Sequence, residues 1–308
     1  MTSIRSLTPE RQSELLSATS RTFAPAISLL SEPTRGVVGL SYLLFRIADT
    51  LEDAAAWPKV ARIRALDELV RLLDANEPAA WREASQRWLA DDPTRHEGYR
   101  ALLEGTPAVI EAMFGLPAGT RDIVRSHVRR TALGMQEVLE RASDDGTVEL
   151  GTIDELRRYC YIVAGIVGEL LTAVFLEHAP QLRAVAPVLV ENQAAFGEGL
   201  QLVNILKDAG DDARENRSFL PKGVSRAEVI ALARRDLDRA DAYNAALAKG
   251  GAPAGFSAFT GLPAELARKN LDLLERHGAG AKVPRDEVVQ IFQRYLADAS
   301  SASAQTGK

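Results

Sequence analysis

Two acidic clusters, one in each half of this sequence, are the groups best suited to bind a metal ion. They run Asp49-Thr50-Leu51-Glu52-Asp53 and Asp208-Ala209-Gly210-Asp211-Asp212. Each lies at the end of a long apolar stretch, which predicts a helix that faces the interior of a bundle. A carboxylate turned inward costs several kcal/mol unless a cation or a hydrogen-bond donor compensates it. Paired inward carboxylates therefore indicate a bound divalent metal, and hard oxygen ligands favour Mg²⁺ held together with the phosphates of a substrate.

Further polar side chains precede each cluster at helical spacing. At about 100° per residue they form one stripe on each helix. The stripes consist of Tyr42, Arg46, Asp49 and Asp53, and of Gln201, Asn204, Asp208 and Asp212. A diphosphate needs ligands and donors together, because bare carboxylates would repel it and a bridging Mg²⁺ reverses the sign of that interaction. Lys207 is a further donor beside the second stripe. Charge-assisted contacts to phosphate oxygens are available from Arg46, Arg214 and Arg217.

The alternative to a binding site is an ordinary solvated helix face, on which single acidic pairs at this spacing are common. The chain would then be a noncatalytic helical scaffold or a metal-binding bundle. That interpretation predicts acidic faces without the accompanying Arg46, Asn204 and Tyr159, all of which this sequence has. We therefore favour a binding site.

Composition bounds the class of protein. The chain has 308 residues with 46% hydrophobic content, enough for a substantial core, and no linker divides it. We expect a single domain over residues 1–299 and a flexible tail over 300–308. The net charge of −5 and the pI near 5.6 argue against a nucleic-acid partner. Cys160 is the only cysteine, which excludes a disulfide framework and fits a reducing cytoplasm.

Helix signals run along the whole chain and alternating strand patterns are essentially missing, which predicts an all-α fold. Capping boxes at Thr152 with Glu155 and at Ser225 with Glu228 begin two of the helices. The expected helices cover residues 9–18, 33–55, 59–75, 121–141, 152–178, 184–212, 225–249, 257–277 and 285–299, with a short helical segment after Pro78.

Glycine and proline residues mark two regions in which we expect the helix to be interrupted or weakened. Residues 91–117 contain Pro107 and Gly105 among other breakers, and we expect short helices and turns there. Gly165 and Gly168 lie inside the expected helix over 152–178, where each weakens the helix by roughly 1 kcal/mol. We expect them to permit close contact with a neighbouring helix or a ligand.

The ordered motifs of this chain resemble those of the squalene/phytoene synthase family. They are Ser20-Arg21-Thr22-Phe23, the stretch from Tyr42 to Asp53, Tyr159-Cys160-Tyr161-Ile162-Val163-Ala164-Gly165-Ile166-Val167-Gly168, the stretch from Gln201 to Asp212, and Arg217-Ser218-Phe219-Leu220-Pro221. The resemblance spans about residues 15–295. It implies an all-α isoprenoid synthase fold, a helical bundle in which the two acidic motifs face each other across a central cavity and hold several Mg²⁺ ions against prenyl diphosphates.

The chemistry that the resemblance implies is the head-to-head joining of two prenyl diphosphates. Ionisation of the first gives an allylic cation, the double bond of the second attacks it, and proton loss closes a cyclopropylcarbinyl diphosphate. A second ionisation drives rearrangement of that ring. In squalene synthases NADPH then quenches the final cation with hydride, whereas in phytoene synthases a proton leaves.

The resemblance also implies roles for individual residues. The metal ligands are Asp49, Glu52, Asp53, Asp208, Asp211 and Asp212. Residues that match positions binding diphosphate or supporting the metal cluster are Arg46, Gln201, Asn204 and Lys207. Tyr42, Arg214 and Arg217 join them as expected substrate-binding residues on the grounds of their spacing and charge. Lys207 stands where most members have Arg, which keeps the charge but loses the bidentate fork. An N-terminal flap that contacts substrate contains Ser20, Arg21 and Phe23. Tyr159 matches the tyrosine proposed to assist proton removal and to stabilise cations through its π face.

Apolar residues after Tyr159 would wall a tunnel for farnesyl chains, or would be ordinary core positions. They are Val163, Ile166, Val167, Leu170, Leu171 and Val174. Each buried CH₂ contributes about 0.8 kcal/mol to binding of the chain. Dryness matters as much, because water would convert a carbocation to an alcohol.

The motifs point to more than one product. Glu52 in the first cluster, and the runs Phe259–Pro263 and Lys282–Arg285, resemble bacterial squalene synthases, whereas the run from Asp208 to Arg214 resembles phytoene synthases. Tyr161-Ile162 replaces the His-Tyr pair common in squalene synthases. No Rossmann fingerprint is present, so NADPH would have to bind in the synthase cavity. We expect squalene from two farnesyl diphosphates, with presqualene diphosphate, hydroxysqualene, dehydrosqualene or phytoene as alternatives.

The sequence also predicts where the protein works. No signal peptide opens it, and no uncharged run reaches the roughly 18 residues of a membrane span. We expect a cytoplasmic protein, with peripheral membrane contact for release of a greasy product.

Overall fold

The computed structural model of the protein describes residues 6–20, 22–144, 147–214 and 219–306, and within these it describes side chains outside 210–214 and 301–306. Across this described part, helices are the regular elements and no strand occurs, which confirms the all-α prediction. The helices group into two compact units.

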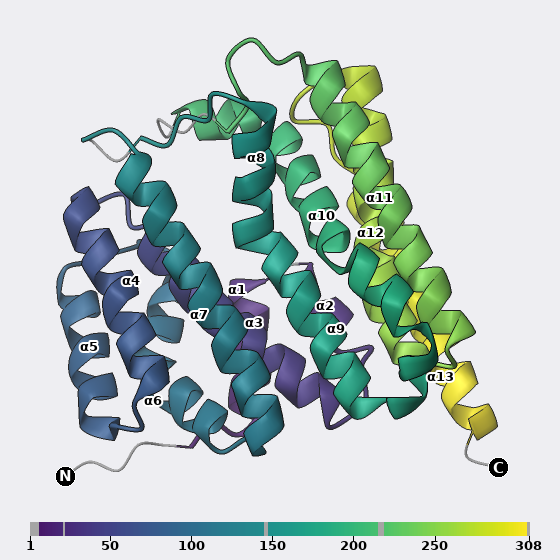
Figure 1. Ribbon diagram of the computed structural model, residues 1–308, viewed down its shortest axis with the longest axis horizontal. Coiled ribbons are helices and arrows are strands. Elements are labelled where there is room, and N and C mark those ends of the chain that lie inside the picture. Colours follow the sequence, from purple (N-terminus) through teal and green to yellow (C-terminus); the bar gives the residue numbers. More distant parts are fainter. Residues whose placement is uncertain (1–5, 21, 145–146, 215–218, 307–308) are drawn as a thin grey trace. The chain divides into compact units, whose positions relative to one another are not determined.

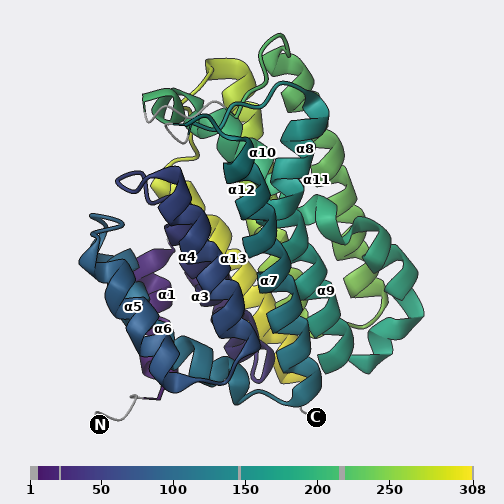
Figure 2. The same ribbon diagram turned by 60° about the vertical axis from the view of Figure 1, so that its left-hand side comes forward.

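Unit 1 comprises Met1–Ala24 and Gly36–Gly146. Its helices are α1 (Pro9–Thr19), nearly all of α3 (Thr34–Glu52), α4 (Lys59–Asp74), α5 (Pro78–Ala90), α6 (Glu97–Phe114) and α7 (Ala118–Arg141). In both views α4 runs beside α7 and α5 beside α6 (Figures 1 and 2). Apolar side chains at helical spacing on α3, among them Leu43, Leu44, Ile47 and Leu51, are fully buried, so this helix is positioned by its core face.

The expectation of short helices and turns over residues 91–117 is wrong, because α6 runs unbroken through Pro107. A proline inside a helix leaves the carbonyl of the fourth preceding residue without its donor. That carbonyl belongs to Leu103, and it accepts a 2.6 Å hydrogen bond from the Ser85 hydroxyl of α5. The neighbouring helix therefore supplies the donor that the proline lacks. Gly105 faces Leu15 of α1, where a Cβ atom would lie 3.4 Å from Leu15 Cδ1.

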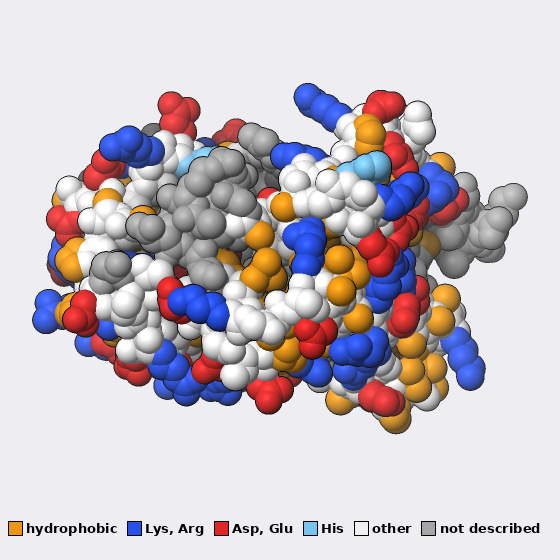
Figure 3. Space-filling view, turned by 90° about the horizontal axis from the view of Figure 1, so that it is seen from above, with side chains coloured by type: hydrophobic (Ala, Val, Ile, Leu, Met, Phe, Trp, Pro, Cys, Tyr) orange, Lys and Arg blue, Asp and Glu red, His pale blue; other side chains and the backbone are white. Residues whose placement is uncertain are grey.

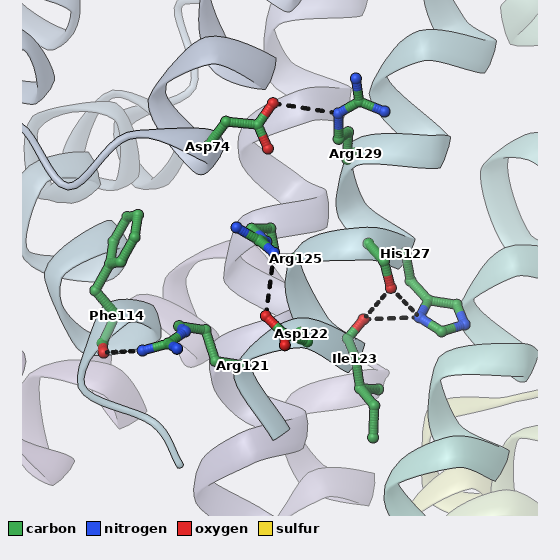
Figure 4. A network of polar contacts seen from close by, with 9 residues as sticks. Asp74, Phe114, Arg121, Asp122, Ile123, Arg125, His127 and Arg129 are labelled. Carbon is green, nitrogen blue, oxygen red and sulfur yellow. Dashed lines mark hydrogen bonds and ion pairs between the residues drawn. The ribbon is translucent and has the colours of Figure 1, made fainter. Parts of the chain in front are cut away.

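Polar contacts along α7 tie it to its neighbours in unit 1 (Figure 4). Arg129 Nε lies 3.3 Å from Asp74 Oδ2 at the end of α4. Arg121 Nη1 donates to the carbonyl oxygen of Phe114 at the end of α6, at 3.3 Å. These exposed or partly exposed contacts fix the ends of helices whose apolar faces are already packed, and each contributes little to stability.

Unit 2 comprises Pro25–Arg35 and Thr147–Lys308. Its helices are α8 (Ile153–Cys160), the π-helical turn η1 (Tyr161–Gly165), α9 (Ile166–His178), the 3₁₀ turn η2 (Pro180–Val185), α10 (Ala186–Arg214), α11 (Arg226–Lys249), α12 (Ala254–His277) and α13 (Arg285–Thr306); the short α2 (Phe23–Ile27) crosses the division between the units. In both views α10 lies among α9, α11 and α12 (Figures 1 and 2). It is the central helix of the unit.

Two helices in unit 2 differ from the expected ones. The helix expected over 152–178 contains the π-helical turn η1, so that α8 and α9 are separate elements. The last helix continues past Ala299 to Thr306, and the Ser300 hydroxyl donates to the Leu296 carbonyl at 2.8 Å within it. Both predicted capping boxes are confirmed, at Thr152 and at Ser225.

Glycines on α9 and α10 allow the backbones of η1 and α9 to contact that of α10. A Cβ atom on Gly168 would lie 1.9 Å from Gln193 O, and one on Gly197 would lie 1.9 Å from Ala164 O. Such distances are far below van der Waals contact, so only glycine fits at these positions. The predicted close approach at Gly168 is therefore made to a neighbouring helix.

The surface carries charges of both signs. On the face drawn in Figure 3, basic and acidic side chains are interspersed with hydrophobic ones. Within the described residues, one helical stretch, Ile153–His178, is long and apolar enough to cross a membrane by length and composition. Of its most apolar window, 61% is buried inside the protein, as in a core helix of unit 2.

Candidate metal and diphosphate sites

The stripe predicted on α3 is present as a chain of contacts. Arg46 Nη1 lies 3.3 Å from Asp49 Oδ2. Its Nη2 donates to the Tyr42 hydroxyl oxygen at 3.1 Å, and that hydroxyl in turn donates to the carbonyl of Thr19 at 3.1 Å. The guanidinium carbon also lies 5.4 Å from the centre of the Tyr42 ring and 5.6 Å from that of Tyr99, within cation–π range. Arg46 is thus held in one orientation by groups from α1, α3 and α6.

The electrostatics of this stripe favour a bound cation. Burial raises the pKa of Asp49 to about 6; the Arg46 guanidinium opposes that shift and Asp53 adds to it. Burial lowers the pKa of Arg46, but the combined attraction of Asp49, Tyr42 and Tyr99 outweighs it, and the net pKa is raised. Arg46 therefore keeps its charge. A second cation near Asp49 and Asp53 would further favour the ionised carboxylates.

Glu52, the last residue of α3, and Asp53, which follows it, lie in different surroundings. Asp53 is exposed and follows the last turn of α3, where its N–H donates to Asp49 O at 2.8 Å. Glu52 is buried, and its Oε1 lies 3.9 Å from Nη2 of the equally buried Arg62 on α4. Arg62 Nε also donates to the backbone carbonyl of Glu52 at 2.5 Å. Sequence reasoning missed Arg62, because no local pattern links it to the acidic cluster.

The N-terminal flap lies against the same stripe in unit 1. The Ser20 hydroxyl oxygen accepts hydrogen bonds from the backbone N–H groups of Phe23 at 2.8 Å and Ala24 at 3.3 Å, which caps α2. The Phe23 ring centre is 6.1 Å from that of Tyr42. Arg21 lies outside the described residues. The structure therefore brings Phe23 to Tyr42 and gives Ser20 a capping role.

The second stripe begins in the same manner on α10. Lys207 Nζ donates to Asn204 Oδ1 at 3.0 Å and lies 3.4 Å from Asp208 Oδ2. Gln201 precedes them and is partly buried. The helical backbone continues through the remaining predicted residues of the cluster and through Arg214, but the side chains of Asp211, Asp212 and Arg214, and the whole of Arg217, lie outside the described part.

Tyr159 is buried and stacks on Phe219, with ring centres 4.7 Å apart and planes inclined by 19°. Two predicted motifs of unit 2 therefore meet. Of the apolar residues proposed to line a tunnel, Val163 and Val167 are partly exposed, whereas the others are buried: Ile166, Leu170, Leu171 and Val174. This division fits a helix with one face in the core and a narrower face available to a ligand.

No group of three or more His, Cys, Asp or Glu side chains placed to hold a metal ion occurs among the side chains that the structure describes. Asp211 and Asp212 are outside that set, and Asp49 and Asp208 belong to different units. The donor set fits Mg²⁺ chemically, since it consists of carboxylate oxygens. The magnesium ligands and the central cavity thus stay predictions.

The helical architecture is that of an isoprenoid synthase. The chain belongs to the squalene/phytoene synthase family, whose family model matches residues 16–291 and so covers parts of both units.

Two curated relatives illustrate the similarity. The squalene synthase of Ganoderma lucidum is 31% identical over 211 residues, which cover 68% of this chain and 43% of that protein. The squalene synthase of Schizosaccharomyces pombe is 28% identical over 214 residues, which cover 68% of this chain and 44% of that protein. The match therefore spans less than half of the length of either relative.

Solved structures share the fold. The structure described as TcSQS with the ligand BPH1237 has a TM-score of 0.69 and 24% identity, and the similarity covers 93% of this chain and 86% of that one. A dehydrosqualene synthase in complex with a ligand has a TM-score of 0.57 and 20% identity, with 95% and 96% covered. At these identities the likeness establishes the fold alone.

Proposed function

We propose that this protein condenses two molecules of farnesyl diphosphate head to head through presqualene diphosphate, with squalene as the final product. The observation that carries the proposal is that, in a chain of this family, each acidic cluster has a cation held against its first aspartate. Arg46 holds Asp49 in this way, and Lys207 holds Asp208.

The residues of α3 and α10 divide the work of binding. Asp49 and Asp53 would bind cations on the first stripe, with Asp208, Asp211 and Asp212 on the second, and Glu52 supporting the first. Arg46 and Lys207 would contact phosphate oxygens directly. When bound, Mg²⁺ would neutralise the diphosphate and so assist its departure from the allylic carbon.

Arg46 is prepared for that contact before substrate arrives. Its guanidinium is fixed by the Tyr42 hydroxyl and by two aromatic faces, so little side-chain entropy remains to be lost on binding. Lys207 lacks the planar fork of an arginine and acts as a point charge oriented by Asn204. The two diphosphates would therefore be held by different means.

Tyr159 would act on the hydrocarbon part of the reaction. Its stacking on Phe219 buries the ring and forms an aromatic surface that can stabilise positive charge. The phenol oxygen would assist loss of the proton that closes the cyclopropane ring. The apolar side chains that follow, such as Val163 and Val167, would exclude water from the cation.

The termination step decides the product. We propose hydride reduction by NADPH, with unreduced products as the second candidate. The second candidate is favoured by one observation: Tyr161, where squalene synthases often have His, donates its hydroxyl proton to Glu169 Oε1 at 2.9 Å. A tyrosine engaged in this way is not a positive group that could attract the phosphates of NADPH.

One incubation tests the function and the product together. The purified protein is supplied with farnesyl diphosphate and Mg²⁺, with and without NADPH, and the extracted hydrocarbons are identified by mass spectrometry. Squalene formed only with NADPH supports the full proposal. Presqualene diphosphate, hydroxysqualene or dehydrosqualene from farnesyl diphosphate, or phytoene from geranylgeranyl diphosphate supplied in its place, would establish the unreduced alternative. No release of diphosphate from either farnesyl or geranylgeranyl diphosphate would exclude both and favour a noncatalytic protein.

We also propose that the protein works in the cytoplasm and delivers its product at a membrane surface. The stretch Ile153–His178 is mostly buried, so peripheral contact explains product release better than a span. Flotation of the protein with vesicles, in the presence and absence of farnesyl diphosphate, measures that contact.

A further inference from the structure

A buried acidic pair lies in unit 2 beside the π-helical turn η1. Glu198 on α10 and Asp236 on α11 are 7% and 3% exposed. The Cβ atom that Gly165 lacks would lie 3.1 Å from Glu198 Oε1, so this carboxylate rests on the last residue of the turn. On the other side, a Cβ atom on Gly199 would lie 3.3 Å from Asp236 Cβ. Both acidic side chains therefore pack where glycines bring backbones together.

The cations around this pair compensate its charge only in part. Arg157 of α8 forms an ion pair with Glu198, at 3.8 Å between Nη2 and Oε2, and its side chain is 46% exposed. Arg239 of α11 instead donates to Asn192 Oδ1 and to a backbone carbonyl of α10. Among the described residues, Asp236 Oδ2 is buried without a hydrogen-bond partner. Two ionised carboxylates in this place would be poorly compensated.

Protonation resolves the conflict. Burial raises the pKa of Glu198, and the charge of Asp236 raises it further, against the opposing effects of Arg157 and Arg239 and with a smaller contribution from Glu169. Burial likewise raises the pKa of Asp236, against Arg157, Arg239 and the exposed Arg235. On α8, the Cys160 thiol faces the same pair, and its pKa is also raised, by burial and then by Glu198 and Asp236.

We propose that Glu198 and Asp236 are positioning residues, at least one of which carries a proton while η1 is closed on α10, and that this proton keeps Tyr159 in its place. A π-helical turn is rare and holds only where its surroundings fix it. Here the fixing groups are the glycine contacts and the carboxyl of Glu198. When both carboxyls ionise, their repulsion and their need for water open the turn, which starts two residues after Tyr159. The consequence for Tyr159 rests on the proposed function, but the response of the turn to pH does not.

The single cysteine offers a direct measurement of this opening. Cys160 is buried and lies between Tyr159 and η1, so an aromatic disulfide reagent modifies it only when the junction opens. The labelling rate of the full chain is divided by that of Glu198→Gln at each pH. Removing the charge of Glu198 can only favour the thiolate in the variant, so thiol ionisation lowers this ratio and cannot produce a rise. The neutral amide cannot ionise, so the variant stays closed.

We expect the ratio to be near one in mild acid and to rise at least about threefold as the pH is raised into the alkaline range, because both pKa values are raised. Asp236→Asn should give the same rise, and it carries the test if Glu198→Gln does not fold by circular dichroism. The control Glu177→Gln changes an exposed carboxylate of α9 and should give a ratio near one throughout. A ratio that does not change with pH for both amide variants would overturn the proposal.

A second measurement reaches Tyr159. The rate of product formation from farnesyl diphosphate should fall on the alkaline side for the unaltered protein and fall less for Glu198→Gln. A purely structural role for Glu198 would lower the rate equally at every pH and would count against positioning. If the unaltered protein consumes no farnesyl diphosphate, the proposed function fails while the labelling ratio still decides whether the pair controls the turn.

Discussion

Glu52 is buried against Arg62, with 3.9 Å between Oε1 and Nη2 and a further hydrogen bond from Arg62 Nε to the Glu52 carbonyl. The pair joins the end of α3 to the start of α4. It therefore holds the position of the helix end at which Asp49 and Asp53 would bind a metal ion. This contact links the stability of unit 1 to the proposed site.

Removing one partner of this pair should destabilise the protein more than removing both. Arg62→Met leaves the Glu52 carboxylate buried without its cation, and we expect a loss of about 3–5 kcal/mol in the free energy of unfolding. The double variant Glu52→Leu with Arg62→Met should recover most of that loss, as measured by urea denaturation. A double variant as unstable as the single one would contradict the ion pair. If Glu52 only positions the cluster, the double variant keeps its dependence on Mg²⁺ concentration; if it is a ligand, that dependence weakens.

The aspartates of the stripes should be essential for turnover and dispensable for folding. Asp53→Ala and Asp212→Ala are each expected to lower the rate of diphosphate release by at least about 100-fold. The reason is that the loss of a ligand weakens the binding of the metal ion, whose charge stabilises the departing diphosphate. Their helical circular dichroism should stay nearly unchanged. The matched control Asp67→Ala removes an exposed carboxylate of α4 that pairs with Arg71 of the same helix, and should keep full activity. Full activity in Asp53→Ala or Asp212→Ala would rule out the assigned metal role.

The Ser85 hydroxyl should matter for stability because of Pro107. Ser85→Ala leaves the buried Leu103 carbonyl unpaired, and we expect a loss of about 1–3 kcal/mol in the free energy of unfolding. Ser126→Ala, whose hydroxyl is exposed, is the control and should cost far less. In the background of Pro107→Ala the helix regains its own donor, so the effect of Ser85→Ala should shrink. Equal effects in both backgrounds would show that the hydroxyl does not compensate the proline.

Asp236→Asn should stabilise the protein at neutral pH. Burial raises the pKa of Asp236 in the folded state, so the protonated form is tolerated there and the ionised form is not. Its favourable contribution is complete below the pKa of an unfolded aspartate, near 4, and is lost as the pH rises through the raised pKa of the folded state. Chemical denaturation at a series of pH values should therefore show the variant gaining stability over the unaltered protein as the pH rises from acid to neutral. A gain confined to acid would contradict the sign of the shift.

Local signals in the sequence predicted well wherever the interacting groups are a few residues apart. The capping boxes at Thr152 and Ser225 are present because both of their hydrogen bonds close within one turn. The contact between Arg46 and Asp49 follows from helical spacing alone. The helix break expected near Pro107 does not occur, because the hydrogen bond that the proline cannot make is supplied by Ser85 of another helix. The π-helical turn was not predicted, because the glycines that permit it are equally compatible with an ordinary helix.

The sequence by itself determined the helical class, the family and the two stripes, since all of these depend on periodicity and on motifs that are contiguous in the chain. Only the tertiary structure decided that Glu52 pairs with Arg62. It also decided that Ser85 donates to the Leu103 carbonyl and that Glu198 packs against Gly165. Each of these pairs joins different elements, and their meeting depends on how side chains fill the core between packed helices. That packing is a collective property of the fold, and no short window of sequence encodes it.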